Sequence, residues 1–133
     1  MKHRVIIALG SAYLQAVHIQ WASERLFTLL DDCTFSKRLW TPDIKGMGKW
    51  YMNQLAYATT TLSVDELQTA LKEIETSTGR TKAHITIDLD LMQYDQQRYH
   101  EKDWQRDYII RCQSSLPCYN FFTSDIRKFQ KSL

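Results

Sequence analysis

The 133-residue sequence lacks three features that would each have assigned it to a distinct class of protein. Its three cysteines are odd in number and show no C-x-x-C spacing, so no disulfide framework is expected. No apolar run approaches the roughly 20 residues that span a bilayer. The run over 5–9 is also too short for the apolar core of a secretory leader. We therefore expect a cytoplasmic protein without a membrane segment, because unpaired cysteines fit a reducing compartment.

The formal net charge is only +2, which is too small to indicate a surface that binds nucleic acid. Basic residues gather at the C-terminal end, at Arg127, Lys128 and Lys131, where we expect solvated side chains. An RNA-binding function would also require an aromatic RNP sequence and a strongly basic strand face, and the sequence has neither. Neither nucleic acid nor a membrane is expected as a partner, and no obligate protein partner is evident.

The chain does contain enough apolar material for one core, with 44% hydrophobic and 24% charged residues. Periodicity and punctuation give the order of its elements. They are a central strand over 5–9, a helix over 13–30, strands over 34–40 and 51–62 joined by a possible binding lid over 42–49, a helix over 64–79 and an acidic strand over 85–91. Residues 96–106 are expected to form a polar loop and residues 107–112 a short strand. This order predicts an α+β fold, a ferredoxin-like βαββαβ sandwich with an antiparallel sheet and helices on one face.

The second helix has the clearest start signal in the chain. Ser63 can cap its first turn, and Glu66 stands three places later, where a capping box requires it. Leu67, Leu71 and Ile74 then recur at helical spacing as an apolar stripe. The acidic segment follows soon after this helix ends.

The most informative segment is 85–91, because strict alternation puts Thr86, Asp88 and Asp90 on one strand face. Same-face residues lie roughly 7 Å apart, so two carboxylates there repel unless solvent or a cation screens them. Mg²⁺ that carries phosphates would do so, since it usually takes one or two protein carboxylates. A solvated strand face is the alternative for an isolated D-x-D pair. A transition-metal site that adds His84 is another alternative.

Short motifs occur along the chain in an order that is more specific than any of them alone. They are Gly10-Ser11, Thr41-Pro42, Tyr51-Met52-Asn53, Ile74-Glu75, Gly79-Arg80, the acidic stretch Thr86-Ile87-Asp88-Leu89-Asp90-Leu91, and His100 six places before Arg106-Asp107-Tyr108. In this order they resemble the motifs of the 6-hydroxymethyl-7,8-dihydropterin pyrophosphokinase family. The resemblance covers most of residues 4–111. It implies one pyrophosphokinase-like domain over 1–133, in which 95–133 is a divergent extension.

The resemblance implies a folate-pathway enzyme that moves pyrophosphate from ATP, its co-substrate, to a pterin alcohol and releases AMP. Asp88 and Asp90 would bind two Mg²⁺ ions that bridge the ATP phosphates. Arg80 and Lys82 would also be catalytic, because cations stabilise charge on transferring phosphoryl groups. The implied ATP-binding set is Glu75, Arg80, Lys82, His100 and Arg106.

The resemblance also implies a pterin pocket. Its residues are Thr41, Pro42, Tyr51, Asn53 and Tyr108. A flat heteroaromatic ring is matched by an aromatic partner such as Tyr108 and by an amide such as Asn53, which both donates and accepts hydrogen bonds. The alternative for the two tyrosines is the ordinary packing of strand aromatics.

The chain departs from the family pattern before the acidic strand. The family usually carries a long loop of the R-W-G-P-R-T type there, whereas only residues 81–85 separate Arg80 from Thr86. Ile85 occupies the place of the last arginine, so a guanidinium expected near the phosphates is absent. Where the family usually has a V-P-H motif, this chain has Arg98-Tyr99-His100, which keeps only the histidine. The alternative function is therefore a catalytically weak or inactive homologue that binds a pterin or a nucleotide.

Overall fold

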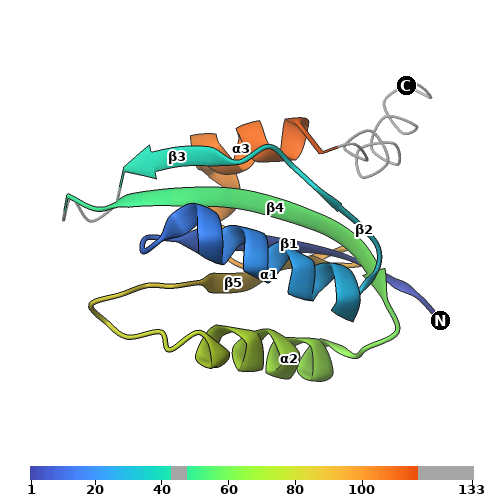
Figure 1. Cartoon of the computed structure of the whole chain (residues 1–133). Coiled ribbons are helices and arrows are strands. Elements are labelled where there is room, and N and C mark those ends of the chain that lie inside the picture. Colours follow the sequence, from blue (N-terminus) through green and yellow to red (C-terminus); the bar gives the residue numbers. More distant parts are fainter. Residues whose placement is uncertain (43–47, 117–133) are drawn as a thin grey trace, which may run out of the picture.

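The structure, a computed structural model, describes residues 1–42 and 48–116. Its elements follow one another as Figure 1 shows: β1 (His3–Ser11), α1 (Gln15–Leu29), β2 (Asp31–Phe35), β3 (Leu39–Pro42), β4 (Trp50–Thr60), α2 (Val64–Ser77), β5 (Asp88–Tyr94), β6 (Gln97–Arg98), a 3-10 helix over Asp103–Gln105, and α3 (Asp107–Ser114). Most of the loop expected over 42–49 lies outside the described residues, as do the basic residues Arg127, Lys128 and Lys131. Within the described residues, no helix has the length and apolar character needed to cross a bilayer.

The sheet is antiparallel throughout, with the strand order β2-β4-β1-β5-β6, and β3 also pairs with β4. β1 is central, as expected, and its apolar run is explained by burial on both faces. Ile6 and Ile7 point to opposite faces of the sheet and are both fully buried. The expected α+β, ferredoxin-like architecture is confirmed.

Helices lie on both faces of this sheet. α1 and α2 cover one face, where they bury a large apolar cluster around Ile7, Ile19 and Leu67. α3 covers the other face, where Ile109 and Cys112 pack against Ile6 and its neighbours. The expectation of helices on one face therefore describes α1 and α2, and α3 adds a third helix opposite them (Figure 1).

Two expected strands differ in the structure. Residues 107–112, expected as a short strand, lie in the helix α3, which buries Ile109 and Cys112, three places apart, against the far face of the sheet. The strand expected over 34–40 is divided into β2 and β3. The division occurs at Ser36, whose hydroxyl accepts the Leu55 N–H at 2.8 Å in place of a backbone carbonyl. The chain then returns to the ladder at Leu39.

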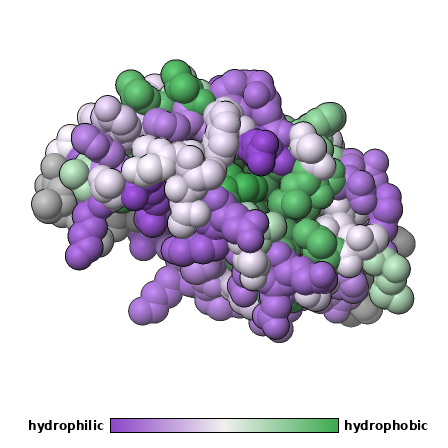
Figure 2. Space-filling view, turned by 60° about the horizontal axis from the view of Figure 1, so that its bottom comes forward, coloured by the Kyte–Doolittle hydropathy of each residue, from purple (hydrophilic) through white to green (hydrophobic). Residues whose placement is uncertain are grey.

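The helix α2 begins with the expected capping box. The Ser63 hydroxyl accepts the Glu66 N–H at 3.2 Å, and the Ser63 N–H donates to the Glu66 carboxylate at 2.9 Å. The expected stripe of Leu67, Leu71 and Ile74 is buried. The outward face of α2 is polar, and Figure 2, which turns this side of the molecule forward, shows a mostly hydrophilic surface with smaller hydrophobic areas.

We expect Ser63→Ala to lower the free energy of unfolding by about 1 kcal/mol, because a lost N-cap acceptor leaves the Glu66 N–H without its side-chain partner. Urea unfolding followed by circular dichroism measures this change. Thr61→Ala is the matched control, since Thr61 is exposed in the preceding turn. Equal losses in the two variants would contradict the capping role.

Candidate active site

A cavity of about 310 Å³ lies on the α3 side of the sheet, and its walls come from β1, β3, β4, β5 and α3. Strand register explains which residues meet there. Gly10 of β1 pairs with Asn53 of β4 on one side and with Asp88 of β5 on the other. Ala8, two residues earlier and so on the same face, pairs with Asp90. Three strands far apart in the sequence thus bring an amide and two carboxylates to one face.

Small side chains create the space in this cavity. Ala8 and Gly10 stand at alternate positions of a strand otherwise rich in Val, Ile and Leu, so they leave a hollow between β4 and β5. A Cβ atom at Gly10 would lie 3.4 Å from the Asn53 side-chain oxygen and 3.8 Å from the Tyr51 ring. Sequence reasoning did not assign Ala8 or Gly10 to the site, although two small residues on one face of an apolar strand are the signal that could have found them.

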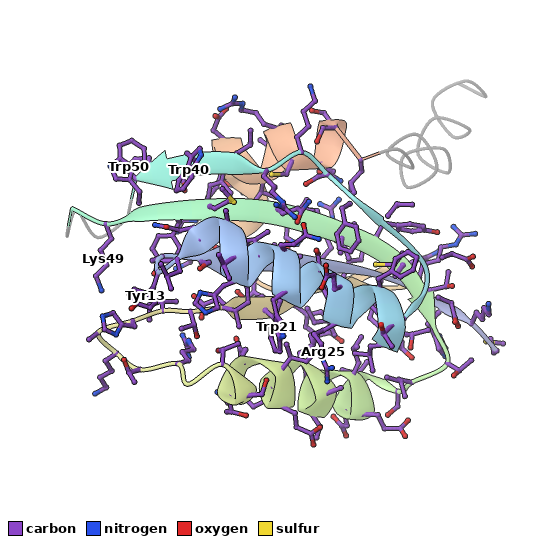
Figure 3. The ribbon with its side chains drawn as sticks, viewed as in Figure 1. Tyr13, Trp21, Arg25, Trp40, Lys49 and Trp50 are labelled. Carbon is purple, nitrogen blue, oxygen red and sulfur yellow. The ribbon has the colours of Figure 1, made fainter. Side chains whose placement is uncertain are left out.

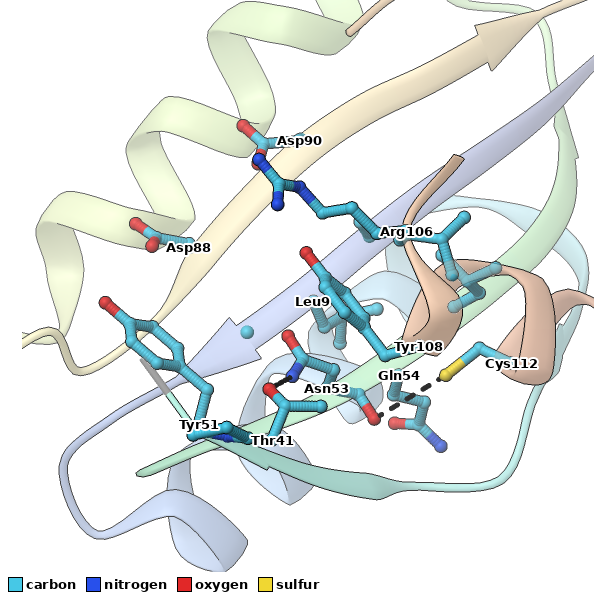
Figure 4. A pocket seen from close by; sticks show the side chains of 15 residues that line it. Leu9, Thr41, Tyr51, Asn53, Gln54, Asp88, Asp90, Arg106, Tyr108 and Cys112 are labelled. Carbon is cyan, nitrogen blue, oxygen red and sulfur yellow. Dashed lines mark hydrogen bonds between the residues drawn. The ribbon is translucent and has the colours of Figure 1, made fainter. Parts of the chain in front are cut away.

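All five residues of the expected pterin pocket line this cavity: Thr41, Pro42, Tyr51, Asn53 and Tyr108. The Asn53 side chain is 9% exposed and donates to the Thr41 hydroxyl at 2.6 Å, so its amide is held in one orientation. Tyr51 and Tyr108 stand on either side of Asn53 (Figure 4). Alternation sends the neighbouring Trp40 to the outside of the ribbon formed by β3 and β4, where Figure 3 shows it beside Trp50.

Asp88 and Asp90 line the same cavity. Burial raises the pKa of both carboxyls above the usual range, and repulsion from Asp90 raises that of Asp88 further. Each carboxylate has a basic side chain beside it: the Arg80 guanidinium lies 2.5 Å from Asp88, where it opposes the rise in pKa, and the His100 imidazole lies 3.9 Å from Asp90. Nearby positive charge therefore stabilises the ionised form of both carboxyls.

These two carboxylates are not part of a larger metal-ligand cluster. Within residues 1–42 and 48–116, no group of three or more His, Cys, Asp or Glu side chains could hold a metal ion. His84, the third ligand of the transition-metal alternative, instead lies against the Tyr13 ring in a tilted arrangement, with the ring centroids 4.0 Å apart. The donor set is two carboxylates, which fits a hard cation that takes its other ligands from water and phosphate.

The structure brings three residues of the expected ATP-binding set to the acidic pair. They are Arg80 beside Asp88, His100 beside Asp90, and Arg106, which lines the cavity. Figure 4 shows the Arg106 guanidinium directed at Asp90. Its Nε donates to Asp103 at 2.8 Å, which fixes its approach.

The other two residues of that set lie elsewhere. Lys82 is exposed and outside the cavity lining. Glu75 is only 9% exposed, and its carboxylate accepts the Leu89 N–H at 2.8 Å. This bond satisfies the edge of β5 that faces away from β1, so Glu75 ties the acidic strand to α2 rather than facing the cavity.

The acidic strand lies further along the chain than expected, since β5 begins at Asp88 and not at residue 85 and ends at Tyr94. The preceding residues bond elsewhere: the Ile85 carbonyl accepts the Ala12 N–H at 2.9 Å, and the Thr86 hydroxyl bonds to that of Thr78. Thr86 is buried by this contact and does not share the cavity with the aspartates. The connection that replaces the family's long loop is thus a short turn attached to the end of β1.

We expect Glu75→Gln to change how stability depends on pH. Burial raises the pKa of Glu75, with the Leu89 N–H opposing the rise, so the folded protein binds its proton more tightly than the unfolded chain. The contribution of Glu75 to stability is then fully present below about pH 4, near its unfolded pKa. It is lost as the pH rises through the folded pKa. The amide of Gln has no such loss and still accepts the Leu89 N–H.

Urea midpoints measured between pH 4 and pH 7 test this expectation. The raised carboxyls of Asp88 and Asp90 remain in both proteins, so the difference between the two curves isolates Glu75. The unmodified chain should lose more stability over this range than the variant. Parallel curves would show that Glu75 has no raised pKa.

A protein-family model described as 7,8-dihydro-6-hydroxymethylpterin-pyrophosphokinase (HPPK) matches residues 6–117. The match spans the chain from within β1 to the end of α3 and includes every residue of the cavity lining. A search of the curated proteins found no match to the chain.

Proposed function

The chain belongs to the 7,8-dihydro-6-hydroxymethylpterin-pyrophosphokinase family, and from this premise we propose how its cavity holds the substrates. Members of the family transfer pyrophosphate from ATP to the hydroxymethyl group of 6-hydroxymethyl-7,8-dihydropterin, a step of folate biosynthesis. The chain is accordingly an ATP-dependent pyrophosphokinase whose substrates are ATP and this pterin. The pterin alcohol attacks the β-phosphorus of ATP, the bond to the α-phosphate breaks, and AMP leaves.

The pterin ring is proposed to lie over Gly10, between Tyr51 and Tyr108. The single observation that carries the proposal is that one cavity contains both a buried amide flanked by two aromatic rings and two carboxylates. The Asn53 amide, oriented by Thr41, offers a donor and an acceptor to the edge of the ring. Aromatic rings on both sides favour a flat ligand.

Asp88 and Asp90 are proposed to hold the Mg²⁺ ions. The donor chemistry fits, because both carboxylates line the cavity, and a cation beside them would oppose the rise in pKa that burial causes. Mg²⁺ ions held by Asp88 and Asp90 would neutralise part of the negative charge on the ATP phosphates. Arg80, His100 and Arg106 surround the same carboxylates and would bind phosphate oxygens.

The free thiols are consistent with the compartment that the sequence predicted. Cys33 and Cys112 are both buried and unpaired, and burial raises the pKa of Cys33 to about 12. Such thiols react slowly because the thiolate is the reactive form. Their state supports a reducing cytoplasm as the place where the enzyme acts.

We expect Asp88→Asn and Asp90→Asn each to lower pterin-dependent AMP release by at least about 100-fold, which is typical for the loss of one preorganised charge at a phosphoryl-transfer site. The assay follows AMP formation from Mg-ATP with and without 6-hydroxymethyl-7,8-dihydropterin. Asp65→Asn is the matched control, since Asp65 is exposed on α2 and removes the same charge away from the cavity. Full turnover in either cavity variant would contradict the proposed metal site.

The same assay tests whether transfer is efficient without the family's long loop. Pterin-dependent AMP from the unmodified chain supports the proposed site. A folded chain that binds pterin and nucleotide yet forms no AMP would identify the catalytically weak homologue that the shortened connection and Ile85 suggested.

We expect Gly10→Ala to weaken pterin binding about tenfold, because one added carbon in a filled cavity typically costs 1–3 kcal/mol. The variant should fold normally, since the new Cβ would meet Asn53 and Tyr51 at ordinary contact distances. Titration of the pterin by its intrinsic fluorescence measures the change, and thermal unfolding confirms the fold. An unchanged pterin affinity would place the ring away from Gly10.

A further inference from the structure

Tyr108 has a ring and a hydroxyl that lie in different parts of the cavity. Its ring is half buried and packs with Ala8 and Leu39 against the apolar cluster under α3. Its hydroxyl extends past this packing toward the Arg106 guanidinium and Asp90 (Figure 4). Because the packing fixes the ring, the position of the hydroxyl is set before any ligand binds.

The Tyr108 hydroxyl makes no hydrogen bond to any residue that the structure describes. The contrast is Tyr94, whose hydroxyl donates to the Leu62 carbonyl at 2.9 Å. The nearest strong cation, Arg106, is already bonded to Asp103. A half-buried phenol in a polar cavity normally has a partner, so this hydroxyl is available to a ligand.

The surroundings of the Tyr108 hydroxyl determine to which ligand atoms it can donate a hydrogen bond. Burial and the nearby carboxylates of Asp103 and Asp90 raise the pKa of Tyr108, which keeps the phenol protonated and able to donate. The pterin-facing polar groups, Asn53 and Thr41, are bonded to each other on another side of the cavity (Figure 4). The hydroxyl instead faces the end of the cavity where the cationic and acidic side chains gather.

We propose that the Tyr108 hydroxyl donates a hydrogen bond to a phosphate oxygen of ATP, while the ring of the same residue contacts the pterin. This inference rests on the proposed function. A neutral donor can approach a phosphate oxygen without pairing with Asp88 or Asp90, so it does not compete with a cation for those carboxylates. Tyr108 would then contact both substrates. Its hydroxyl would also supply a hydrogen-bond donor to the phosphates in a chain that has Ile85 in place of the family's arginine.

The test compares binding of the two substrates by Tyr108→Phe, which keeps the ring and removes only the hydroxyl. The probes are 6-hydroxymethylpterin and, with Mg²⁺, the non-transferable nucleotide α,β-methylene-ATP, each titrated by calorimetry. We expect the Kd of the pterin to change by less than about twofold. The Kd of the nucleotide should rise about tenfold to 100-fold, which is the range for a hydrogen bond to a charged partner.

Tyr99→Phe is the matched control, because Tyr99 is a partly buried tyrosine outside the cavity lining. It should leave both Kd values unchanged, and thermal unfolding should show both variants folded. Unchanged nucleotide affinity in Tyr108→Phe, or a loss confined to the pterin, overturns the inference and leaves the proposed function intact. Failure of the unmodified chain to bind α,β-methylene-ATP overturns both.

Discussion

The pairing of β1 with its two neighbours is the constraint on which the rest of the site depends. Gly10 lies between Asn53 and Asp88, and Ala8 lies beside Asp90. A slip of one residue in either ladder would turn the corresponding side chains to the α1 face, because strand side chains alternate. The buried apolar residues of β5 oppose such a slip, since it would turn Leu89 and Leu91 from the core under α1 and α2 toward the cavity. The apolar core thus fixes the polar geometry of the cavity.

The helix α3, near the C-terminal end of the described residues, forms the remaining wall of the cavity. Ile109 and Cys112 anchor it on the sheet, and this anchoring carries Arg106 and Tyr108 to the acidic pair. Basic side chains from three separate segments then lie around two carboxyls whose pKa burial raises. The balance of charge at this end of the cavity supports the proposal that a polyphosphate binds there with a divalent cation.

Much of the fold and of the candidate site could be predicted from local patterns. The apolar run of β1, the capping box at Ser63 and the alternation around Asp88 and Asp90 each depend on residues within a few places of one another. Two of the expected strands differ because nonlocal contacts override the pattern. Ser36 interrupts an expected strand by bonding to Leu55, and α3 is helical because it covers the far face of the sheet.

The sequence by itself determined the βαββαβ core order, the family to which the chain belongs and the residue types of the cavity. Only the tertiary structure decided how those residues are used. It turned Glu75 to the edge of β5 and left Lys82 outside the lining, although both had matched the same motif set as Arg80. The physical reason is distance along the chain. Which partner a side chain meets depends on the register of strands and the packing of helices, and no local pattern contains that information.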